Sequence, residues 1–335
     1  MYRAFAGESM SRAFLTGAAG FAGSFLTELL LRRGDRVCGL VQPGTSTAYL
    51  QAAQAGPDAA RLELVSGDLL DRQELRTIVG DWQPDAIYHL AGQASVRRSL
   101  DDPAETFRVN VLGTQAVLEA ARAACRLRML LVSSADVYGV ACEGGHAVAE
   151  DAPLFPLSPY ASSKAAAEAL ARRAAQEDGL EIVTVRPFPH TGPRQSPQFV
   201  FPSLARQVAE IRVGLRPPRL EVGNLDARRD LGDVRDTVRG YWLAMEWGKP
   251  AAVYNICTGQ APSVREVLDR LIRLAGASLE VVVERDRLRS ADVDALIGNG
   301  AHFRTETGWA PTHSLDDTLR DLLAYWEAES IGNRA

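Results

Sequence analysis

The sequence predicts an α/β fold with a doubly wound parallel sheet. Short apolar runs alternate with helix-length segments over the first half of the chain, and a glycine-rich turn joins the first run to the first helix. Strands connected by helices in this way lie parallel and are joined by right-handed crossovers. Small or polar residues follow four of the runs: Gly17, Asp68, Gly92 and Ser134. Because ligands bind beyond the carboxyl ends of such strands, we expect these four residues to line one site.

The glycine-rich turn lies within Arg12–Gly23, which reads R-A-F-L-T-G-A-A-G-F-A-G. The apolar run Ala13–Leu15 predicts a buried strand, and the apolar positions of Phe21–Arg33 fit a helix. Between strand and helix stand Gly17, Gly20 and Gly23. Glycines here permit a tight turn, let backbone N–H groups approach a diphosphate and bring the helix close to the strand, while the positive end of the helix attracts the anion. The pattern favours dinucleotide binding by a Rossmann-type sheet over a small-residue loop without a ligand.

The second expected strand, Asp35–Gln42, bears on the choice of dinucleotide. A site that prefers NAD carries an acidic residue near the end of this strand, where it binds the ribose 2′-hydroxyl. The residues that follow, Pro43–Thr47, contain no carboxylate to repel a 2′-phosphate, and no arginine is evidently placed to bind one. The sequence therefore favours NADPH and leaves NADH as an alternative.

Three further strands and a long helix complete the expected pattern: strands Arg61–Asp68, Pro84–Ala91 and Leu127–Ser134, and the helix Asp101–Ala124. Asp68, at a strand end, suits a hydrogen bond to an adenine amino group, or else caps the helix that begins at Asp71. Ala91 and Gly92 are small enough for the backbone to approach a bound dinucleotide. We expect His89, inside the fourth strand, to be a packed core histidine and not a catalyst.

A serine, a tyrosine and a lysine form the candidate chemical group. The fifth strand runs into S-S-A-D-V-Y-G (133–139), and S-P-Y-A-S-S-K (158–164) opens a later, alanine-rich helix. Tyr160 and Lys164 are four residues apart and share one helix face. A tyrosine hydroxyl has a pKa of about 10, and we expect the lysine ammonium to stabilise the phenolate and lower that pKa. With Ser134 bonded to a carbonyl oxygen, these are the parts of a hydride-transfer site in which Tyr160 moves the proton.

Together, T-G-A-A-G-F-A-G, the helix carrying Asn110, S-S-A-D-V-Y-G and Y-A-S-S-K resemble the extended short-chain dehydrogenase/reductase superfamily, over about Arg12 to Trp326. Four more stretches resemble its GDP-sugar branch: H-L-A-G-Q (89–93), R-P-F-P-H-T-G-P-R-Q (186–195), L-E-V-G-N-L-D-A-R-R-D (220–230) and V-Y-N-I-C-T-G-Q (253–260). The set is similar to GDP-6-deoxy-D-mannose reductases, with GDP-mannose 4,6-dehydratases as close relatives. It implies NAD(P)H-dependent reduction of the C4 ketone of GDP-4-keto-6-deoxy-D-mannose to GDP-6-deoxy-D-mannose (GDP-D-rhamnose), and leaves a talose-like product open.

The resemblance also implies roles for individual residues. The catalytic residues would be Ser134, Tyr160 and Lys164. The cofactor-binding residues would be Gly17, Gly20, Phe21, Ala22, Gly23, Asp68, Leu69, Leu90, Ala91, Gly92, Asn110, Tyr160, Lys164 and Phe188. The substrate-binding residues would be Ser134, Asp136, Gln195, Arg229 and Arg289. A guanidinium matches phosphate oxygens bidentately, which suits the two arginines to a nucleotide diphosphate; the alternative for each is a solvated surface arginine. No metal ligand is implied.

Two positions refine this expectation. The dehydratases carry a glutamate where this chain has Asp136, and use it to remove the C5 proton. Aspartate is one methylene shorter, and ketone reduction needs no such base, so this position favours the reductase. The branch usually has asparagine where this chain has Pro189, and proline offers neither an amide side chain nor a backbone donor for the sugar. A catalytically silent dinucleotide-binding scaffold is a third alternative, which the retention of Ser134, Tyr160 and Lys164 argues against.

The expected organisation is a sheet domain of residues 11–187 plus 229–257 and a smaller, mostly helical nucleotide-sugar-binding lobe of residues 188–228 plus 258–335. Residues 1–10 are expected to form a flexible extension. From Phe188 the composition shifts toward proline and arginine, but the helix Asp233–Trp247 and the strand Ala252–Cys257 return to the main sheet. A final amphipathic helix is expected over Ser314–Trp326.

Small residues on two helices predict a homodimer. The helices are Pro103–Ala124 and Pro159–Glu177, and the residues include Ala116, Ala120, Ala161, Ala165 and Ala169. Small side chains let helices approach closely, and the family commonly pairs these two helices about a twofold axis. The alternative is that the alanines pack on the protein's own sheet.

Composition excludes several other classes of protein. The chain has 37 basic and 42 acidic residues, a net charge of −5, and no long basic run, which argues against nucleic acid or anionic membranes as partners. No apolar run approaches the roughly 18 residues needed to span a bilayer, and the first residues lack the layout of a secretory signal. The four cysteines, Cys38, Cys125, Cys142 and Cys257, are scattered, and the five histidines form no metal-ligand cluster. We expect reduced cysteines and a cytoplasmic location.

Overall fold

The structure is a computed structural model that describes residues 11–122, 127–142, 145–283 and 294–332; the expected extension, residues 1–10, lies outside this part. Its centre is a seven-stranded sheet in the order β11-β6-β5-β4-β1-β2-β3. The strands are β1 (Arg12–Thr16), β2 (Arg36–Val41), β3 (Leu62–Ser66), β4 (Ala86–His89), β5 (Arg128–Val132), β6 (Glu181–Pro187) and β11 (Val253–Ile256). Neighbouring strands are all parallel. The order from β3 to β6 is that of a Rossmann-type sheet, so the predicted fold class is confirmed.

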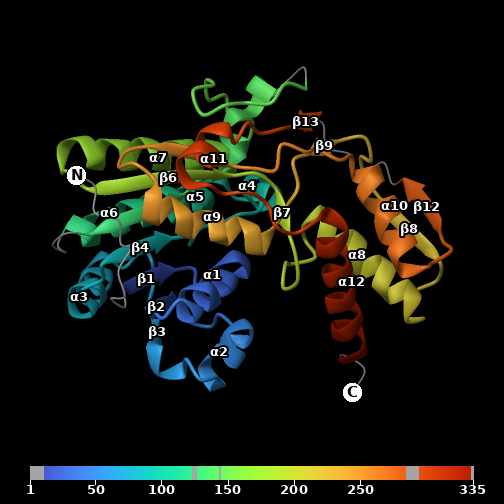
Figure 1. Cartoon of the computed structure of the whole chain (residues 1–335), viewed down its shortest axis with the longest axis horizontal. Coiled ribbons are helices and arrows are strands. Elements are labelled where there is room, and N and C mark those ends of the chain that lie inside the picture. Colours follow the sequence, from blue (N-terminus) through green and yellow to red (C-terminus); the bar gives the residue numbers. More distant parts are fainter. Residues whose placement is uncertain (1–10, 123–126, 143–144, 284–293, 333–335) are drawn as a thin grey trace.

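Helices cover both faces of the sheet (Figure 1). One face packs on α1 (Phe21–Arg32) and α9 (Val234–Trp247), and the other on α3 (Arg72–Trp82), α6 (Gly113–Arg122) and α7 (Pro159–Glu177). Along β1, Ala13 and Leu15 belong to the first apolar cluster while Phe14 belongs to the second. Consecutive side chains of a strand point to opposite faces, so a strand covered on both faces must be apolar throughout. This explains the near-continuous apolar runs of the sequence.

A separate apolar cluster lies beside the sheet, at the right of Figure 1. It is built by α8 (Val200–Arg212), α10 (Val264–Ala275), α12 (Leu315–Gly332) and the parallel pair β8 (Arg219–Val222) and β12 (Glu280–Val283). The remaining elements are η1 (Ala48–Leu50), α2 (Gln51–Ala55), η2 (Ala59–Arg61), α4 (Val96–Asp101), α5 (Pro103–Phe107), η3 (Arg108–Leu112), η4 (Ala135–Cys142), β7 (His190–Thr191), β9 (Arg228–Arg229), β10 (Gly232–Asp233), β13 (Ala295–Leu296) and α11 (Ala301–Thr307). The expected domain boundaries stay a prediction.

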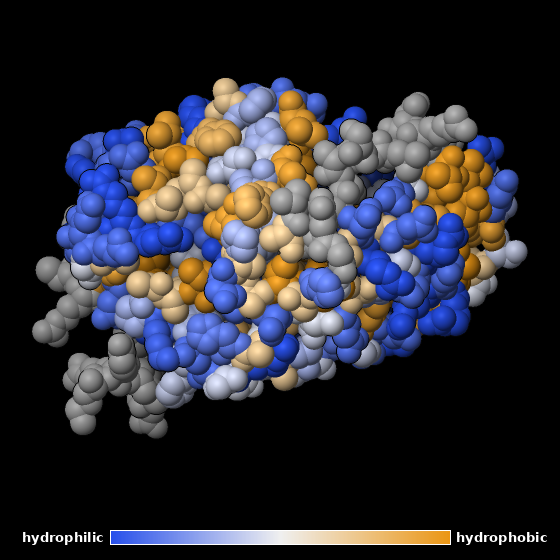
Figure 2. All heavy atoms as spheres, turned by 90° about the horizontal axis from the view of Figure 1, so that it is seen from above, coloured by the Kyte–Doolittle hydropathy of each residue, from blue (hydrophilic) through white to orange (hydrophobic). Residues whose placement is uncertain are grey.

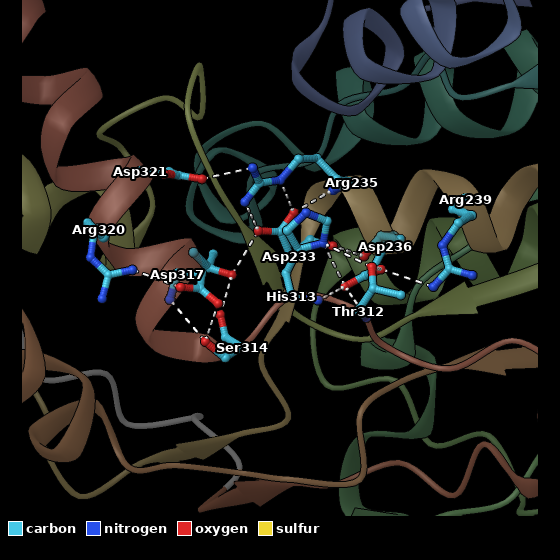
Figure 3. A network of polar contacts seen from close by, with 12 residues as sticks. Asp233, Arg235, Asp236, Arg239, Thr312, His313, Ser314, Asp317, Arg320 and Asp321 are labelled. Carbon is cyan, nitrogen blue, oxygen red and sulfur yellow. Dashed lines mark hydrogen bonds and ion pairs between the residues drawn. The ribbon is translucent and has the colours of Figure 1, made fainter. Parts of the chain in front are cut away.

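Two carboxylates at the start of α9 join this helix to the C-terminal segment (Figure 3). Asp233 caps α9 and accepts a 2.7 Å hydrogen bond from the Thr318 hydroxyl of α12. Asp236 accepts hydrogen bonds from the backbone N–H groups of Thr312 and His313, each 2.9 Å long. Burial alone would raise the pKa of Asp236, but a hydrogen bond from the Thr312 hydroxyl, the two backbone bonds and the bond of Arg239 outweigh burial and hold the pKa below its usual value. These hydrogen bonds thereby fix the segment before α12 to α9, a helix that packs on the central sheet.

Three local expectations differ from the structure. The helix expected over Asp101–Ala124 is interrupted by η3, a π-turn between α5 and α6, and its end at residues 123–126 lies outside the described part. The last helix, α12, continues past Trp326 to Gly332. The alternative role of Asp68 as a helix cap is wrong, because α3 is capped by Asp71, whose carboxylate accepts from two backbone N–H groups of the first turn. Asp68 instead accepts a 2.9 Å hydrogen bond from Leu70 N.

Other sequence expectations concern cysteines, membranes and metals. Cys38 and Cys257 are buried and unpaired; Cys125 and the side chain of Cys142 lie outside the described part. Among the helices described, none combines the length and the apolar character needed to cross a bilayer. Within the same residues, no group of three or more histidine, cysteine, aspartate or glutamate side chains is placed to hold a metal ion.

Gly23→Ala should destabilise the protein, because a Cβ at Gly23 would lie 1.9 Å from the carbonyl oxygen of Gly17. Such overpacking costs about 1–3 kcal/mol or more of unfolding free energy. Gly80→Ala is the matched control, since a Cβ there, inside α3, meets no atom within 4 Å. The control should gain about 0.5–1 kcal/mol. Urea unfolding of both variants measures the difference, and equal stabilities would contradict the tight contact between turn and helix.

Candidate active site

The glycine-rich turn has the geometry of an anion-binding site. Gly17 has a φ of +77°, and a Cβ there would lie 2.9 Å from Ala91 N, so only glycine fits. Gly20 is the N-cap of α1, and within the described structure no side chain caps this helix and no acidic residue stands in its first turn. The first N–H groups of α1 are therefore left for an anion. With Phe21, Ala22 and Gly23 forming that first turn, the residues present fit a dinucleotide diphosphate.

The ends of β1 and β4 meet beside this turn. The backbone N–H of Leu90 donates to Thr16 O, and that of Ala91 donates to the Thr16 hydroxyl, each at 3.2 Å. A Cβ at Gly92 would lie 2.8 Å from Asn110 Oδ1 and 3.6 Å from Lys164 Nζ. The structure thus brings together Gly92, Asn110 and Lys164, three of the candidate cofactor-binding residues. Asp68 is exposed at the end of β3, while Leu69 is buried and packs against Gly113.

Ser134, Tyr160 and Lys164 also converge. Ser134 follows β5, and Tyr160 lies in the first turn of α7, which begins at Pro159 behind the N-cap Ser158. The Ser134 hydroxyl lies near enough to the Tyr160 hydroxyl to lower the pKa of that tyrosine. Lys164 Nζ donates a 2.9 Å hydrogen bond to Val132 O at the end of β5. The helix face and the strand end therefore meet at the place that the spacing predicts.

The expected effect of Lys164 on Tyr160 is not what the structure shows. The pKa of Tyr160 is raised above its usual value, first by burial and then by the negative charge of Asp136, while the hydrogen bond to Ser134 lowers it. Because Lys164 directs its ammonium to Val132 O, burial determines the direction of the shift. Tyr160 therefore keeps its proton at neutral pH and has a proton available to donate.

The pKa of Lys164 is also shifted. Burial lowers its pKa to about 8, and the carboxylate of Glu168, four residues later on α7, opposes this decrease. Glu168 is itself buried in a 2.7 Å ion pair with Arg186 of β6, and it accepts a 2.5 Å hydrogen bond from the Ser133 hydroxyl. Sequence reasoning missed Glu168. The signal was present, since positions 160, 164 and 168 follow the four-residue spacing of one helix face.

Asn110 lies in the π-turn η3, and its carboxamide is used within the protein. Its Oδ1 accepts a 2.8 Å hydrogen bond from Gln93 N, and its Nδ2 donates to Gln93 O at 3.0 Å and to the Ser163 hydroxyl at 2.9 Å. π-Turns are frequent at functional sites. Here the turn places Asn110 between the loop that follows β4 and the first turns of α7.

The residues expected further along the chain have different surroundings. Phe188 is buried against Tyr138, with ring centroids 6.3 Å apart. Gln195 accepts a 2.6 Å hydrogen bond from the Thr191 hydroxyl and donates to His190 O at 3.1 Å, so both ends of its amide contact its own loop. Arg229 lies in β9 and donates to Arg228 O at 2.8 Å. Arg289 lies outside the described residues. Asp136 follows Ser134, and its backbone N–H donates to the Ser134 hydroxyl at 3.1 Å.

His190 is a further site residue that sequence reasoning did not single out. Its ring stacks on Phe21 with centroids 5.9 Å apart and an interplanar angle of 11°. Burial lowers the pKa of His190, so the ring is neutral. The stretch R-P-F-P-H-T-G-P-R-Q contains this histidine, but the stack on α1 is a tertiary contact that its sequence position does not reveal.

Comparison with known proteins agrees with this geometry. A sequence model of the family described as GDP-mannose 4,6 dehydratase matches residues 14–322. The chain belongs to this family. It is 36% identical over 325 residues to GDP-6-deoxy-D-mannose reductase of Pseudomonas aeruginosa, covering 95% of this chain and 97% of that protein. It is 32% identical over 323 residues to GDP-mannose 4,6 dehydratase 1 of Arabidopsis thaliana, covering 93% and 88%.

Solved structures give the same result. The structure of RMD from Pseudomonas aeruginosa complexed with NADPH matches with a TM-score of 0.81 and 35% identity, covering 96% of this chain and 100% of that chain. These findings confirm the predicted membership of the extended short-chain dehydrogenase/reductase superfamily.

The charge state of Lys164 should appear in the pH dependence of the reaction. Because its pKa is about 8, Lys164 is charged below that pH and loses its charge above it. We expect kcat/KM for the dinucleotide, which reports ionisations of the free enzyme, to fall as the pH rises through this region. Glu168→Gln removes the carboxylate that raises the pKa of Lys164, so the decline should begin at lower pH.

Glu177→Gln is the control for this profile. Glu177 ends the same helix in an exposed ion pair with Arg173, far along α7 from Lys164. Its profile should match that of the unmodified protein. A Glu168→Gln profile that also stays unchanged would show that the carboxylate does not act on Lys164.

Proposed function

We propose that the protein is an NADPH-dependent reductase that converts the C4 ketone of GDP-4-keto-6-deoxy-D-mannose to the alcohol of GDP-6-deoxy-D-mannose, also called GDP-D-rhamnose. The observation that carries this proposal is the convergence of Ser134 at the end of β5 with Tyr160 and, one turn further along α7, buried Lys164. The relative named GDP-6-deoxy-D-mannose reductase, matched over nearly the whole of both chains, supports the substrate. The NADPH in the related structure supports the cofactor.

Each residue has a definite task in this reaction. Tyr160, protonated at neutral pH, donates its proton to the oxygen on C4 as that oxygen gains negative charge. Ser134 donates a hydrogen bond to the same oxygen and orients the ketone. Lys164 directs its ammonium to Val132 O and places a positive charge close to the strand end where the dinucleotide would bind. NADPH, when bound at the glycine-rich turn, supplies the hydride to C4.

The cofactor and substrate contacts complete the proposal. We assign the diphosphate of NADPH to the N–H groups of Gly20–Gly23, with Gly17 and Ala91 allowing its close approach. The absence of a carboxylate in residues 42–47 supports NADPH, and the absence of an arginine there leaves NADH as a weaker alternative. Arg229 is our candidate for the diphosphate of the GDP-sugar. We also place the protein in the cytoplasm, which the two buried, unpaired cysteines support.

A second candidate, GDP-mannose 4,6-dehydratase, is favoured by the family match over residues 14–322. That reaction needs a base to reach the C5 hydrogen while the C4 oxygen is held by Ser134 and Tyr160. The candidate base is Asp136, whose backbone N–H is bonded to the Ser134 hydroxyl, so its main chain is fixed next to the strand end. A carboxylate one methylene shorter than glutamate is displaced by about 1 Å, which can cost on the order of a hundredfold in rate. We therefore favour the reductase.

One experiment separates the two functions. The protein is incubated with GDP-mannose and NADP⁺, and separately with GDP-4-keto-6-deoxy-D-mannose and either NADPH or NADH, and the products are identified by NMR. We expect little 4-keto product from GDP-mannose, and reduction of the ketone with one equivalent of cofactor oxidised. Asp136→Asn should slow that reduction only modestly. Conversion of GDP-mannose without net cofactor consumption, abolished by Asp136→Asn, would establish the dehydratase instead.

Tyr160→Phe serves as the negative control in the same assay. The substitution removes the proton donor but keeps the ring that packs at the start of α7. Turnover should fall by roughly a hundredfold or more, as expected for loss of a general acid, while NADPH binding measured by fluorescence stays nearly unchanged.

We further propose that the protein forms a homodimer through the helices around α7. Of the five alanines that suggested this, Ala116, Ala120 and Ala161 are buried within their own chain, so the alternative explanation holds for them. Support comes instead from large apolar residues on α4, α5 and η3 that are 39–59% exposed: Leu100, Phe107 and Leu112. Figure 2 shows that apolar atoms reach the surface in several separate groups among hydrophilic residues. Exposed apolar residues of this kind mark interaction surfaces.

Light scattering at micromolar concentration should give the mass of a dimer. Phe107→Asp places a charge in the proposed interface and should shift the mass to that of a monomer. Leu215→Asp is the control, because Leu215 is exposed to a similar extent, 42%, but lies just after α8 and not on α4, α5 or η3. A monomer mass for the unmodified protein, or monomers from both variants, would refute this interface.

A further inference from the structure

A buried chain of hydrogen bonds connects the end of β1 to the π-turn that carries Asn110. His89, at the end of β4, is only 3% exposed, which confirms the expectation of a core histidine. Its Nδ1 lies 2.7 Å from the Thr16 hydroxyl, and its Nε2 lies 3.0 Å from the Thr114 hydroxyl. The Thr16 hydroxyl also accepts a hydrogen bond from Ala91 N. Both ring nitrogens are therefore engaged, one toward the glycine-rich turn and the other toward α6.

The geometry determines which group donates and which accepts in each hydrogen bond of this buried series. The Thr114 hydroxyl donates its single proton to Asn110 O at 2.7 Å. At the His89 contact Thr114 must then accept, so Nε2 carries the ring proton. Burial, helped by the positive charge of Lys164, lowers the pKa of His89 to about 3, so the ring is neutral and its Nδ1 accepts from the Thr16 hydroxyl. One neutral tautomer satisfies all the groups, whereas in a protonated ring Nδ1 would also be a donor, and the Thr16 hydroxyl would lose its acceptor at His89.

The path continues from Asn110 to Tyr160. Asn110 Nδ2 donates to the Ser163 hydroxyl at 2.9 Å, and that hydroxyl donates to the carbonyl oxygen of Tyr160 at 2.7 Å. The connection thus runs from the strand beside the glycine-rich turn, through β4, α6 and η3, to the first turn of α7. These are the elements that place the dinucleotide on one side and the proton donor on the other.

We propose that His89 is a positioning residue, a neutral imidazole protonated on Nε2 that holds Asn110 and the first turn of α7 in register with the glycine-rich turn. This inference rests on the reductase proposed above. His89 contacts no reacting atom, so it acts on the rate only through the placement of Tyr160 relative to the cofactor. A misplacement of about 1 Å at such a site can cost up to a hundredfold in rate.

Thr114→Val tests the proposal, because it removes one hydroxyl at nearly constant volume and interrupts the chain between His89 and Asn110. We expect kcat to fall about tenfold or more, while KM for the keto sugar and Kd for NADPH stay within about twofold. Thr114→Ser restores the hydroxyl and should recover most of kcat. Thr27→Val is the matched control, since the Thr27 hydroxyl is buried in α1 without a hydrogen-bond partner among the described residues; its kcat should stay unchanged.

A double variant and a second site make the test specific. If His89 and Thr114 act along one path, His89→Phe combined with Thr114→Val should lose no more kcat than the worse single variant. Ser163→Ala interrupts the other end of the path, and it should also lower kcat with little effect on NADPH binding, which keeps the proposal testable if Thr114→Val does not fold. Unchanged kcat in both Thr114→Val and Ser163→Ala, or equal losses in the serine and valine variants of Thr114, would overturn the proposal.

An incorrect reductase assignment can be distinguished experimentally from an incorrect positioning role of His89. If the unmodified protein does not reduce GDP-4-keto-6-deoxy-D-mannose, the proposed function is wrong and the kinetic test does not apply. Hydrogen exchange of residues 158–166 in the NADPH-bound protein then gives the answer. Thr114→Val should accelerate exchange there and Thr27→Val should not. Equal exchange in the two variants would refute the positioning role by itself.

Discussion

The buried ion pair between Glu168 and Arg186 is the interaction on which the geometry of the site depends. It joins α7 to β6, and around it the Ser133 hydroxyl donates to Glu168 while Arg186 donates to the Tyr138 hydroxyl and to Glu150 O, at 2.9 and 3.0 Å. Two charges with side chains only 1% and 3% exposed carry a large desolvation cost, which these bonds offset. Such a pair adds little net stability compared with apolar packing. Its value here is orientation, because it fixes the helix of Lys164 against the strand end of Ser134.

Burial has opposite consequences for the two titratable groups of the site. It favours the neutral form of each, so it raises the pKa of Tyr160 and lowers that of Lys164. The result is a protonated tyrosine beside a lysine that keeps its charge at neutral pH but loses it near pH 8, with Asp136 and Glu168 supplying negative charge on either side. A site of this kind holds its proton until a reacting oxygen becomes basic enough to take it. That behaviour suits a general acid better than the preformed phenolate that the Tyr160–Lys164 spacing suggested.

Features that depend on nearby residues could be predicted from the sequence, whereas contacts between separate elements could not. The strand ends, the glycine-rich turn and the trio of Ser134, Tyr160 and Lys164 could be predicted because periodicity and spacing determine them. The π-turn at Arg108–Leu112 could not, since it shifts a helix by one residue without changing its apolar pattern. The pairing of Glu168 with Arg186 and the stack of His190 on Phe21 join separate elements. The direction of the Tyr160 pKa shift depends on burial, which residue spacing does not report.

The order of strands in the sheet also determines how the protein is made. The chain leaves the sheet after β6, builds α8 and β8 in the other cluster, and returns only through α9 and β11. While the ribosome synthesises the intervening residues, β6 is therefore an open edge whose backbone N–H and C=O groups lack a neighbour on one side. Unpaired edges of this kind invite association with other chains. The nascent protein is exposed to misassembly in this interval, which ends when Val253–Ile256 emerges, pairs with β6 and leaves the four-residue strand β11 as the edge of the sheet.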